Sequence, residues 1–110
     1  MKHICVRCNE TIDFGREVVQ MLEGPWYGGD VITPAFTSLF AEWHLSCFQD
    51  EFPLNPQAYP YKCEECRRDV LFGETISFLI IGEETDEYST VAEKRGNQIC
   101  TVKHYASCPQ

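Results

Sequence analysis

The sequence is poor in basic residues and has no long apolar run. Its 110 residues include 9 Lys and Arg against 17 Asp and Glu, which gives a formal net charge of −8. A surface this acidic repels nucleic-acid phosphates unless its few basic side chains gather on one face. The longest apolar run, from Ile76 to Ile81, is interrupted by Ser77 and is too short to span a bilayer. These absences disfavour a nucleic-acid-binding role and predict no membrane-embedded segment.

The sequence also lacks the motifs of the common enzyme classes. It has no glycine loop that would cradle a phosphate and no recognisable Ser/His/Asp set. Glu42 stands two residues before His44, which reverses the His-x-Glu order of zinc-dependent nucleobase deaminases, and Lys62 precedes Cys63 where those enzymes have proline. No apolar segment of a secretory signal follows Lys2. We therefore expect a non-enzymatic protein of the reducing cytoplasm.

Cysteine, by contrast, is abundant, with seven in the chain. Such a content indicates a disulfide framework in an oxidising compartment and metal sites in a reducing one. Two Cys-x2-Cys pairs are each followed, far downstream, by a His/Cys pair with x2 or x3 spacing, and a disulfide scaffold has no need of the histidines. The candidate metal ligands are Cys5, Cys8, His44 and Cys47, and then Cys63, Cys66, His104 and Cys108.

The donor set predicts the metal. A Cys-x2-Cys turn can direct both sulfurs at one ion about 2.3 Å away. Three thiolates and one imidazole fill a tetrahedral shell and leave no open position, which is typical of structural zinc; iron is the alternative metal. We predict two zinc ions per chain. Each site would add −1, because three thiolates outweigh Zn²⁺, and the loaded protein would carry a charge of about −10.

An internal repeat organises the chain. An offset of 58 residues places Cys5 and Cys8 on Cys63 and Cys66, and Phe14-Gly15 on Phe72-Gly73. The offset then slips by two or three residues at the His/Cys pairs, as a loop of different length would cause. The pattern predicts two related zinc modules, residues 1–58 and 59–110, packed as one compact unit.

The periodicity predicts a small, metal-stabilised, mainly β fold made of zinc knuckles and β-hairpins, with little helix. We expect strands at 17–23, 37–43, 75–81 and 98–103, a turn at 94–97, a linker at 52–57 and a short helix near 46–51.

Two further potential ligands are assigned other roles by the repeat. Cys100 lies four residues before His104, and the residue four before His44 is Phe40, so Cys100 is expected to be a small core hydrophobe. His3 matches Tyr61 and is expected to pack as an aromatic ring or to lie on the surface. The x3 spacing of the second pair leaves open that one of them replaces His104 or Cys108.

The segment Trp43-His44-Leu45-Ser46-Cys47-Phe48 resembles the His-x2-Cys stretch of LIM domains, and the order of the modules is similar to treble-clef and zinc-ribbon proteins. The resemblance implies ligand roles for Cys5, Cys8, His44 and Cys47. It covers only the ligands and a few aromatic neighbours. Here 35 residues separate Cys8 from His44 and 15 separate Cys47 from Cys63, both longer than in LIM domains.

The loops after Gly24 and Gly82 differ between the two halves. Trp26 and Tyr27 in the first either form an exposed aromatic surface or cover a small core. The acidic second loop, 82–88, is expected to be a solvated hairpin tip, with contact to a basic partner as the alternative.

We therefore expect a protein-interaction or adaptor module with an unidentified protein partner. The alternative is a small nucleic-acid-binding regulator that uses a basic face of the second half. Its basic residues are Lys62, Arg67, Arg68, Lys94, Arg95 and Lys103. A zinc-dependent enzyme or a thiol redox switch is a third, weaker hypothesis.

The ligand assignment is tested by two serine substitutions. Cys100→Ser should leave the zinc content unchanged, because Cys100 is assigned to the core. Cys108→Ser should lose about one zinc equivalent per chain, since it removes the fourth thiolate of the second site. Elemental analysis of the purified variants checks both, and the reverse pattern would show that the wrong fourth ligand has been chosen.

Overall fold

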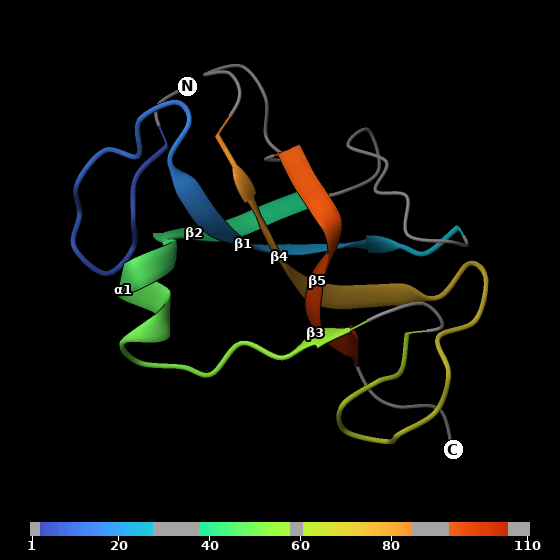
Figure 1. Cartoon of the computed structure of the whole chain (residues 1–110). Helices are drawn as coiled ribbons and strands as arrows, with labels where there is room; N and C mark the ends of the chain where they lie inside the picture. The colour runs from blue at the N-terminus through green and yellow to red at the C-terminus, as the bar shows by residue number, and fades with distance from the viewer. Residues whose placement is uncertain (1–2, 28–37, 58–60, 85–92, 106–110) are drawn as a thin grey trace.

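The computed structural model describes residues 3–27, 38–57, 61–84 and 93–105, and for residues 93–98 the backbone alone. The fold is mainly β with one short helix and an antiparallel sheet (Figure 1). Its elements are β1 (Glu17–Pro25), β2 (Ser38–His44), α1 (Leu45–Gln49), β3 (Pro56–Gln57), β4 (Thr75–Glu83) and β5 (Glu93–His104).

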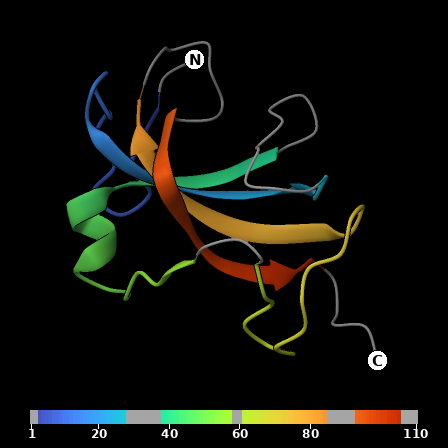
Figure 2. The same cartoon turned by 45° about the vertical axis from the view of Figure 1, so that its right-hand side comes forward.

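The five strands form one sheet in the order β2-β1-β4-β5-β3. The central pair, β1 and β4, is antiparallel over the whole length of both strands, from Glu17 opposite Glu83 to Pro25 opposite Thr75. The two halves of the sequence therefore share one sheet. Two loops rich in cysteine precede β1 and β4, the first knuckle (residues 3–16) and the second knuckle (residues 61–74). They lie at opposite ends of the sheet in both views (Figures 1 and 2).

Side chains alternate between the two faces of the sheet, as the period of a strand requires. On one face, Leu22 of β1 and Ile80 of β4 are completely buried in the largest apolar cluster. Trp26 and Tyr61 complete this cluster beside the second knuckle. On the other face, α1 places Phe48 against Val19, Leu79 and Cys100. The core is thus divided between the two faces of a single sheet.

The two knuckles have the same backbone geometry. The amide of Cys5 donates to the carbonyl of Glu10 and the amide of Cys63 to that of Arg68, both at 3.0 Å. Asn9 and Arg67 have positive φ angles of 62° and 64°, which lets the chain curl back around the cysteines.

Each central strand is tied at its end to the knuckle of the other half. The amide of Trp26, after β1, donates to the carbonyl of Glu74 at 2.8 Å. The amide of Glu84, after β4, donates to the carbonyl of Arg16 at 3.2 Å. These positions are 58 residues apart, as are the knuckle bonds. The boundary at residue 58 stays a prediction, because the two halves are interleaved by these bonds and by the sheet.

The four expected strands and the short helix are present, with β1, β4 and β5 longer than expected. The expected turn at 94–97 is wrong. Those residues continue β5, where Lys94 pairs with Gly82 and a register shift absorbs the irregularity. The expected linker is partly wrong, since its last residues form β3 and pair with Cys100 and Ile99. Most of the two variable loops lies outside the described residues.

Candidate metal centres

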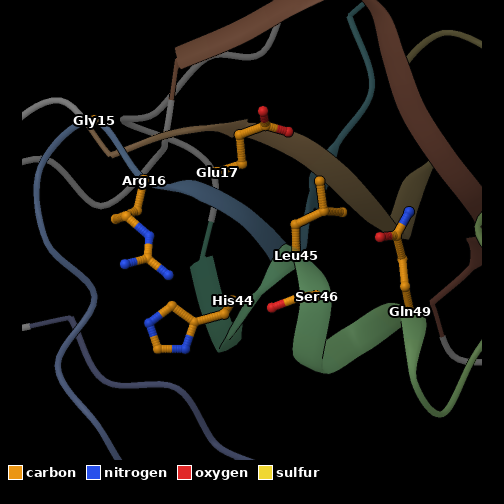
Figure 3. Close-up of a pocket in the computed structure, with 7 residues that line it drawn as sticks. All are labelled: Gly15, Arg16, Glu17, His44, Leu45, Ser46 and Gln49. Atoms are coloured by element: carbon orange, nitrogen blue, oxygen red, sulfur yellow. The ribbon is translucent and has the colours of Figure 1, made fainter.

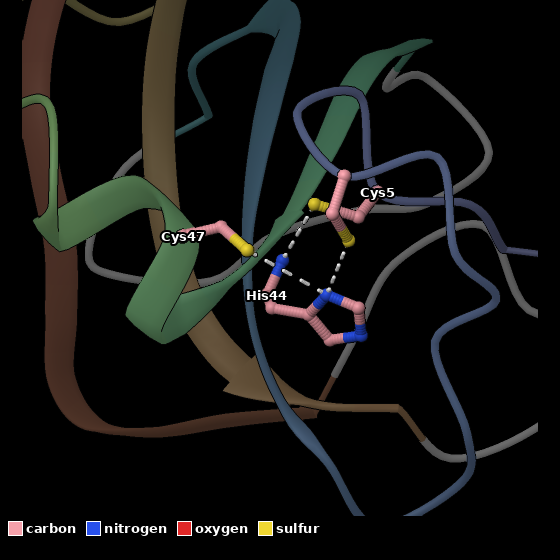
Figure 4. A group of neighbouring side chains, drawn as sticks. Cys5, His44 and Cys47 are labelled. Carbon is pink, nitrogen blue, oxygen red and sulfur yellow. Dashed lines mark hydrogen bonds between the residues drawn. The ribbon is translucent and has the colours of Figure 1, made fainter.

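The first cluster of candidate ligands is assembled from three parts of the fold. Cys5 and Cys8 come from the first knuckle, His44 from the last position of β2 and Cys47 from α1. One ligand atom from each lies within 4.8 Å of all the others. Figure 4 shows the sulfur of Cys47 facing the Nδ1 atom of the His44 ring, while the sulfur of Cys5 lies beside the backbone amide of His44. The structure therefore brings together all four residues predicted for the first site.

The second cluster contains Cys63 and Cys66 from the second knuckle and His104 from the end of β5, again with their ligand atoms within 4.8 Å. Cys108, its predicted fourth member, lies outside the described residues. The described part of this site is therefore a set of three donors, two sulfurs and one nitrogen.

The distances within both clusters suit a tetrahedral zinc ion. The Nδ1 atom of His44 is 3.4 Å from the sulfur of Cys8 and 3.9 Å from that of Cys47. The Nδ1 atom of His104 is 3.5 Å from the sulfur of Cys66. Zn–S bonds of about 2.3 Å and Zn–N bonds of about 2.05 Å at the tetrahedral angle place S and N about 3.6 Å apart. These three S–N distances are therefore compatible with zinc.

The first knuckle prepares one of its sulfurs as a thiolate. Burial would raise the pKa of Cys5, but backbone hydrogen bonds, including one from the His44 amide at 3.4 Å, lower it to about 6. Burial and the neighbouring Cys5 raise the pKa of Cys47 to about 11. Without a cation the cluster cannot hold several thiolates together. Binding of a metal would release the remaining thiol protons.

In the second cluster, a carboxylate orients the histidine. Nε2 of His104 is 3.0 Å from Oε2 of Glu74, whose Oε1 accepts the Leu71 amide at 2.6 Å. Burial lowers the pKa of His104, but the neighbouring Cys63 and Glu74 outweigh this effect and the pKa is raised. A carboxylate behind a ligating imidazole fixes the ring and increases the basicity of the other nitrogen.

Two arginine side chains lie near the first cluster, whereas the carboxylate of Glu74 lies beside the second. Arg16 occupies the position 58 residues before Glu74, and its side chain points toward His44 at one end of a pocket of about 410 Å³ (Figure 3). Ser46 and Gln49 of α1 line the same pocket. On another side, Arg7 donates to the carbonyl of Cys47 at 3.0 Å and to Asp50 at 2.9 Å. The two guanidinium groups lower the electrostatic cost of a metal site with net charge −1.

A third cluster of polar side chains was missed by the sequence analysis. His3, Glu42 and Glu84 are all buried, with ligand atoms within 4.8 Å of one another. The surface alternative expected for His3 is wrong, because the ring is buried and its Nδ1 atom bonds to Glu42 at 2.7 Å. Glu84 is not at a solvated tip, since its backbone is bonded to the first knuckle.

Other residues discussed from the sequence also have defined places. Cys100 is completely buried in the core, and burial raises its pKa to about 11. Trp26 covers the core, whereas the half-exposed Tyr27 contacts Phe72 with ring centroids 5.6 Å apart. Lys62 and Lys103 are within ion-pair distance of Asp69 and Glu65, at 3.6 and 3.9 Å. The side chains of Lys94 and Arg95 are outside the described part.

Comparisons of the chain with models of protein families, with curated proteins and with solved structures found no match. Among the described residues, no helix is long and apolar enough to cross a membrane. The geometry of the Cys/His clusters is therefore the observation that points to a function.

The Glu74–His104 contact gives a prediction for metal retention. Glu74→Gln keeps an oxygen for the Leu71 amide but directs an NH₂ group at Nε2 of His104, so it should weaken metal binding at the second site by about 10–100-fold. Competition with a chromophoric chelator measures the change. Glu65→Gln, in the same knuckle and exposed, is the control and should bind as the wild type does. Equal affinity of both variants would contradict the role of Glu74.

Proposed function

We propose that this chain is a zinc-stabilised protein-interaction module with two structural zinc sites. The first is formed by Cys5, Cys8, His44 and Cys47. In the second, Cys108 completes the set of Cys63, Cys66 and His104. Zinc holds each knuckle to the strand that carries its histidine, and side chains presented by this frame recognise a protein partner.

The assignment of zinc rests on the distances between the cysteine sulfurs and the histidine nitrogens. The three S–N distances, 3.4, 3.5 and 3.9 Å, lie around the value of about 3.6 Å for neighbouring ligands of tetrahedral zinc. Two independent clusters meet this condition, each with mixed sulfur and nitrogen donors. Such donors favour zinc over the hard cations Mg²⁺ and Ca²⁺.

A structural role for the metal follows from the closed ligand set. A catalytic zinc keeps a position open for water or substrate. In the first cluster four protein donors lie within reach of one ion and fill the tetrahedron. His44 does line the neighbouring pocket, but its Nδ1 atom faces the cysteine sulfurs. We therefore favour a structural site over an enzyme or a redox switch.

Metal removal tests the zinc sites. The purified protein should contain two zinc ions per chain by elemental analysis, and seven thiols should titrate after denaturation in chelator. Chelation should abolish the β-sheet circular dichroism, because structural zinc contributes on the order of 10–16 kcal/mol in small zinc modules, more than the stability of a typical domain. A chain that retains its spectrum without metal, or that contains disulfides in place of zinc, would contradict the proposal.

An exposed apolar surface at the second knuckle supports the interaction role. Phe72 and Leu71 are 76% and 64% exposed, and Tyr27 packs edge-on against Phe72. The three side chains come from both halves of the chain, so the surface exists only when the sheet is formed. Aromatic side chains are enriched at the energetic centres of protein interfaces. We propose that Tyr27, Leu71 and Phe72 contact the partner.

This surface has a matched control in the first knuckle. Phe14 occupies the equivalent place to Phe72 and is also exposed. Phe72→Ser should abolish capture of a partner from a lysate of the source cells, because truncation of a central interface aromatic costs about 2 kcal/mol or more. Phe14→Ser should capture the same protein as the wild type, and both variants should keep their zinc. Loss in both variants, or in neither, would contradict this assignment.

Two of the four candidate basic side chains that the structure describes weaken the nucleic-acid alternative, whereas Arg67 and Arg68 are exposed. Of its candidate residues, Lys62 and Lys103 lie beside carboxylates, which reduces their attraction for phosphates. Charge therefore favours a protein partner.

A further inference from the structure

The buried cluster of His3, Glu42 and Glu84 is separate from the cysteine sites. His3 is the first residue of the first knuckle, Glu42 belongs to β2 and Glu84 follows β4. Their exposed fractions are only 3%, 6% and 3%. The carbonyl of His3 accepts the Ile12 amide at 2.7 Å, and the carbonyl of Glu84 accepts the Gly15 amide at 2.9 Å. The backbone of the first knuckle thus holds two members of the cluster in place.

The hydrogen bonds within the cluster leave two polar atoms unsatisfied. Nδ1 of His3 is 2.7 and 2.8 Å from the two oxygens of Glu42, so it donates to that carboxylate. Gln20 also donates to Glu42, at 2.6 Å. Nε2 of His3 lies 3.4 Å from Oε2 of Glu84. Within the part of the chain that the structure describes, this nitrogen and Oε1 of Glu84 have no hydrogen-bond partner.

Burial also disfavours two negative charges in this cluster. Two carboxylates share a buried space, and burial together with Glu42 raises the pKa of Glu84 to about 8. Because Nδ1 of His3 donates to Glu42, a neutral ring has its lone pair on Nε2. A divalent cation beside this lone pair would balance both carboxylates. The ion would also bind the two atoms that lack a hydrogen-bond partner among the described residues, Nε2 of His3 and Oε1 of Glu84.

The need to fill space in the core does not explain why polar residues form the His3, Glu42 and Glu84 cluster. At the 58-residue offset, His3 and Glu84 correspond to Tyr61 and Trp26, whose rings pack edge-on with centroids 5.1 Å apart. Gln20 corresponds to Phe78, and Glu42, aligned with the His/Cys pair, to Val102; both are buried in the core. The equivalent space beside the second knuckle is filled with side chains from both halves of the chain that pack in the apolar core, so the fold can also fill it without a polar cluster.

We propose that His3 and Glu84 bind a divalent transition-metal ion at a third site, with Nε2 and a carboxylate oxygen as ligands and Glu42 holding the imidazole through Nδ1. Glu42, His3 and the ion would form the carboxylate–histidine–metal arrangement that is common around protein metals. A nitrogen and carboxylate donor set accepts Mn²⁺ as well as Zn²⁺, whereas thiolate sites prefer zinc. The third site therefore differs from the other two in the metals that it accepts.

Manganese binding measured by electron paramagnetic resonance tests the third site. The protein is refolded with two equivalents of Zn²⁺ and increasing Mn²⁺, because the site is buried, and the signal of free Mn²⁺ is recorded. The wild type should bind one Mn²⁺ per chain, and Glu84→Gln should reduce its affinity at least tenfold. Glu83→Gln, one residue earlier in β4, should bind as the wild type does. Retention of two zinc ions separates this result from the fate of the cysteine sites.

A second variant keeps the test decisive if Glu84→Gln fails to fold. Gln20→Phe, His3→Tyr, Glu42→Val and Glu84→Trp together install the set of core residues found beside the second knuckle. This variant should fold with two zinc ions and bind no Mn²⁺. Absence of Mn²⁺ binding in the wild type, or equal binding by the wild type and either altered protein, would overturn the third site and leave a hydrogen-bonded network of one imidazole and two carboxylates.

Discussion

The attachment of each cysteine knuckle to the strand that carries its histidine is the constraint on which the rest of the structure depends. The amide of Val6 donates to the carbonyl of Glu42 at 2.9 Å, and the amide of Glu64 donates to that of Val102 at 2.8 Å. These bonds place each pair of sulfurs beside its histidine. In the proposed account, zinc makes the attachment permanent.

The central pair of strands then couples the two attachments. β1 begins at the first knuckle and ends at the second, and β4 runs the opposite way. Loss of one metal site would therefore disturb the pairing that supports the other. The surroundings of the two sites nevertheless differ in charge, with Arg16 near His44 and Glu74 behind His104.

Much of this arrangement could be predicted from the residues alone. The spacing of the ligands in the sequence predicted the first cluster, because two cysteines separated by two residues can direct both sulfurs at one ion. The alternation of apolar and polar residues predicted the strands. The turn at 94–97 was predicted wrongly because Gly96 and Asn97 favour turns locally, whereas pairing along β4 decides the conformation. A local propensity does not contain that long-range contribution.

The buried polar cluster could not be predicted from composition, since an acidic residue near a loop is usually solvated. Its signal was present in the repeat, where Glu84 falls on Trp26 and His3 on Tyr61. A polar residue aligned with a core aromatic indicates either an exposed position or a buried functional one. The backbone hydrogen bonds of Glu84 with Arg16 and Gly15, which the sequence does not reveal, show that Glu84 is at a buried position.

The most direct test of the account is X-ray absorption at the zinc edge of protein that carries two zinc equivalents. The account predicts a first shell of about three sulfurs near 2.3 Å and one nitrogen at about 2.0–2.1 Å per zinc, averaged over both sites. A shell of nitrogen and oxygen alone would contradict it. So would a mixed shell with about two sulfurs or fewer per zinc, because the cysteine clusters would then not be the ligands that hold the fold together.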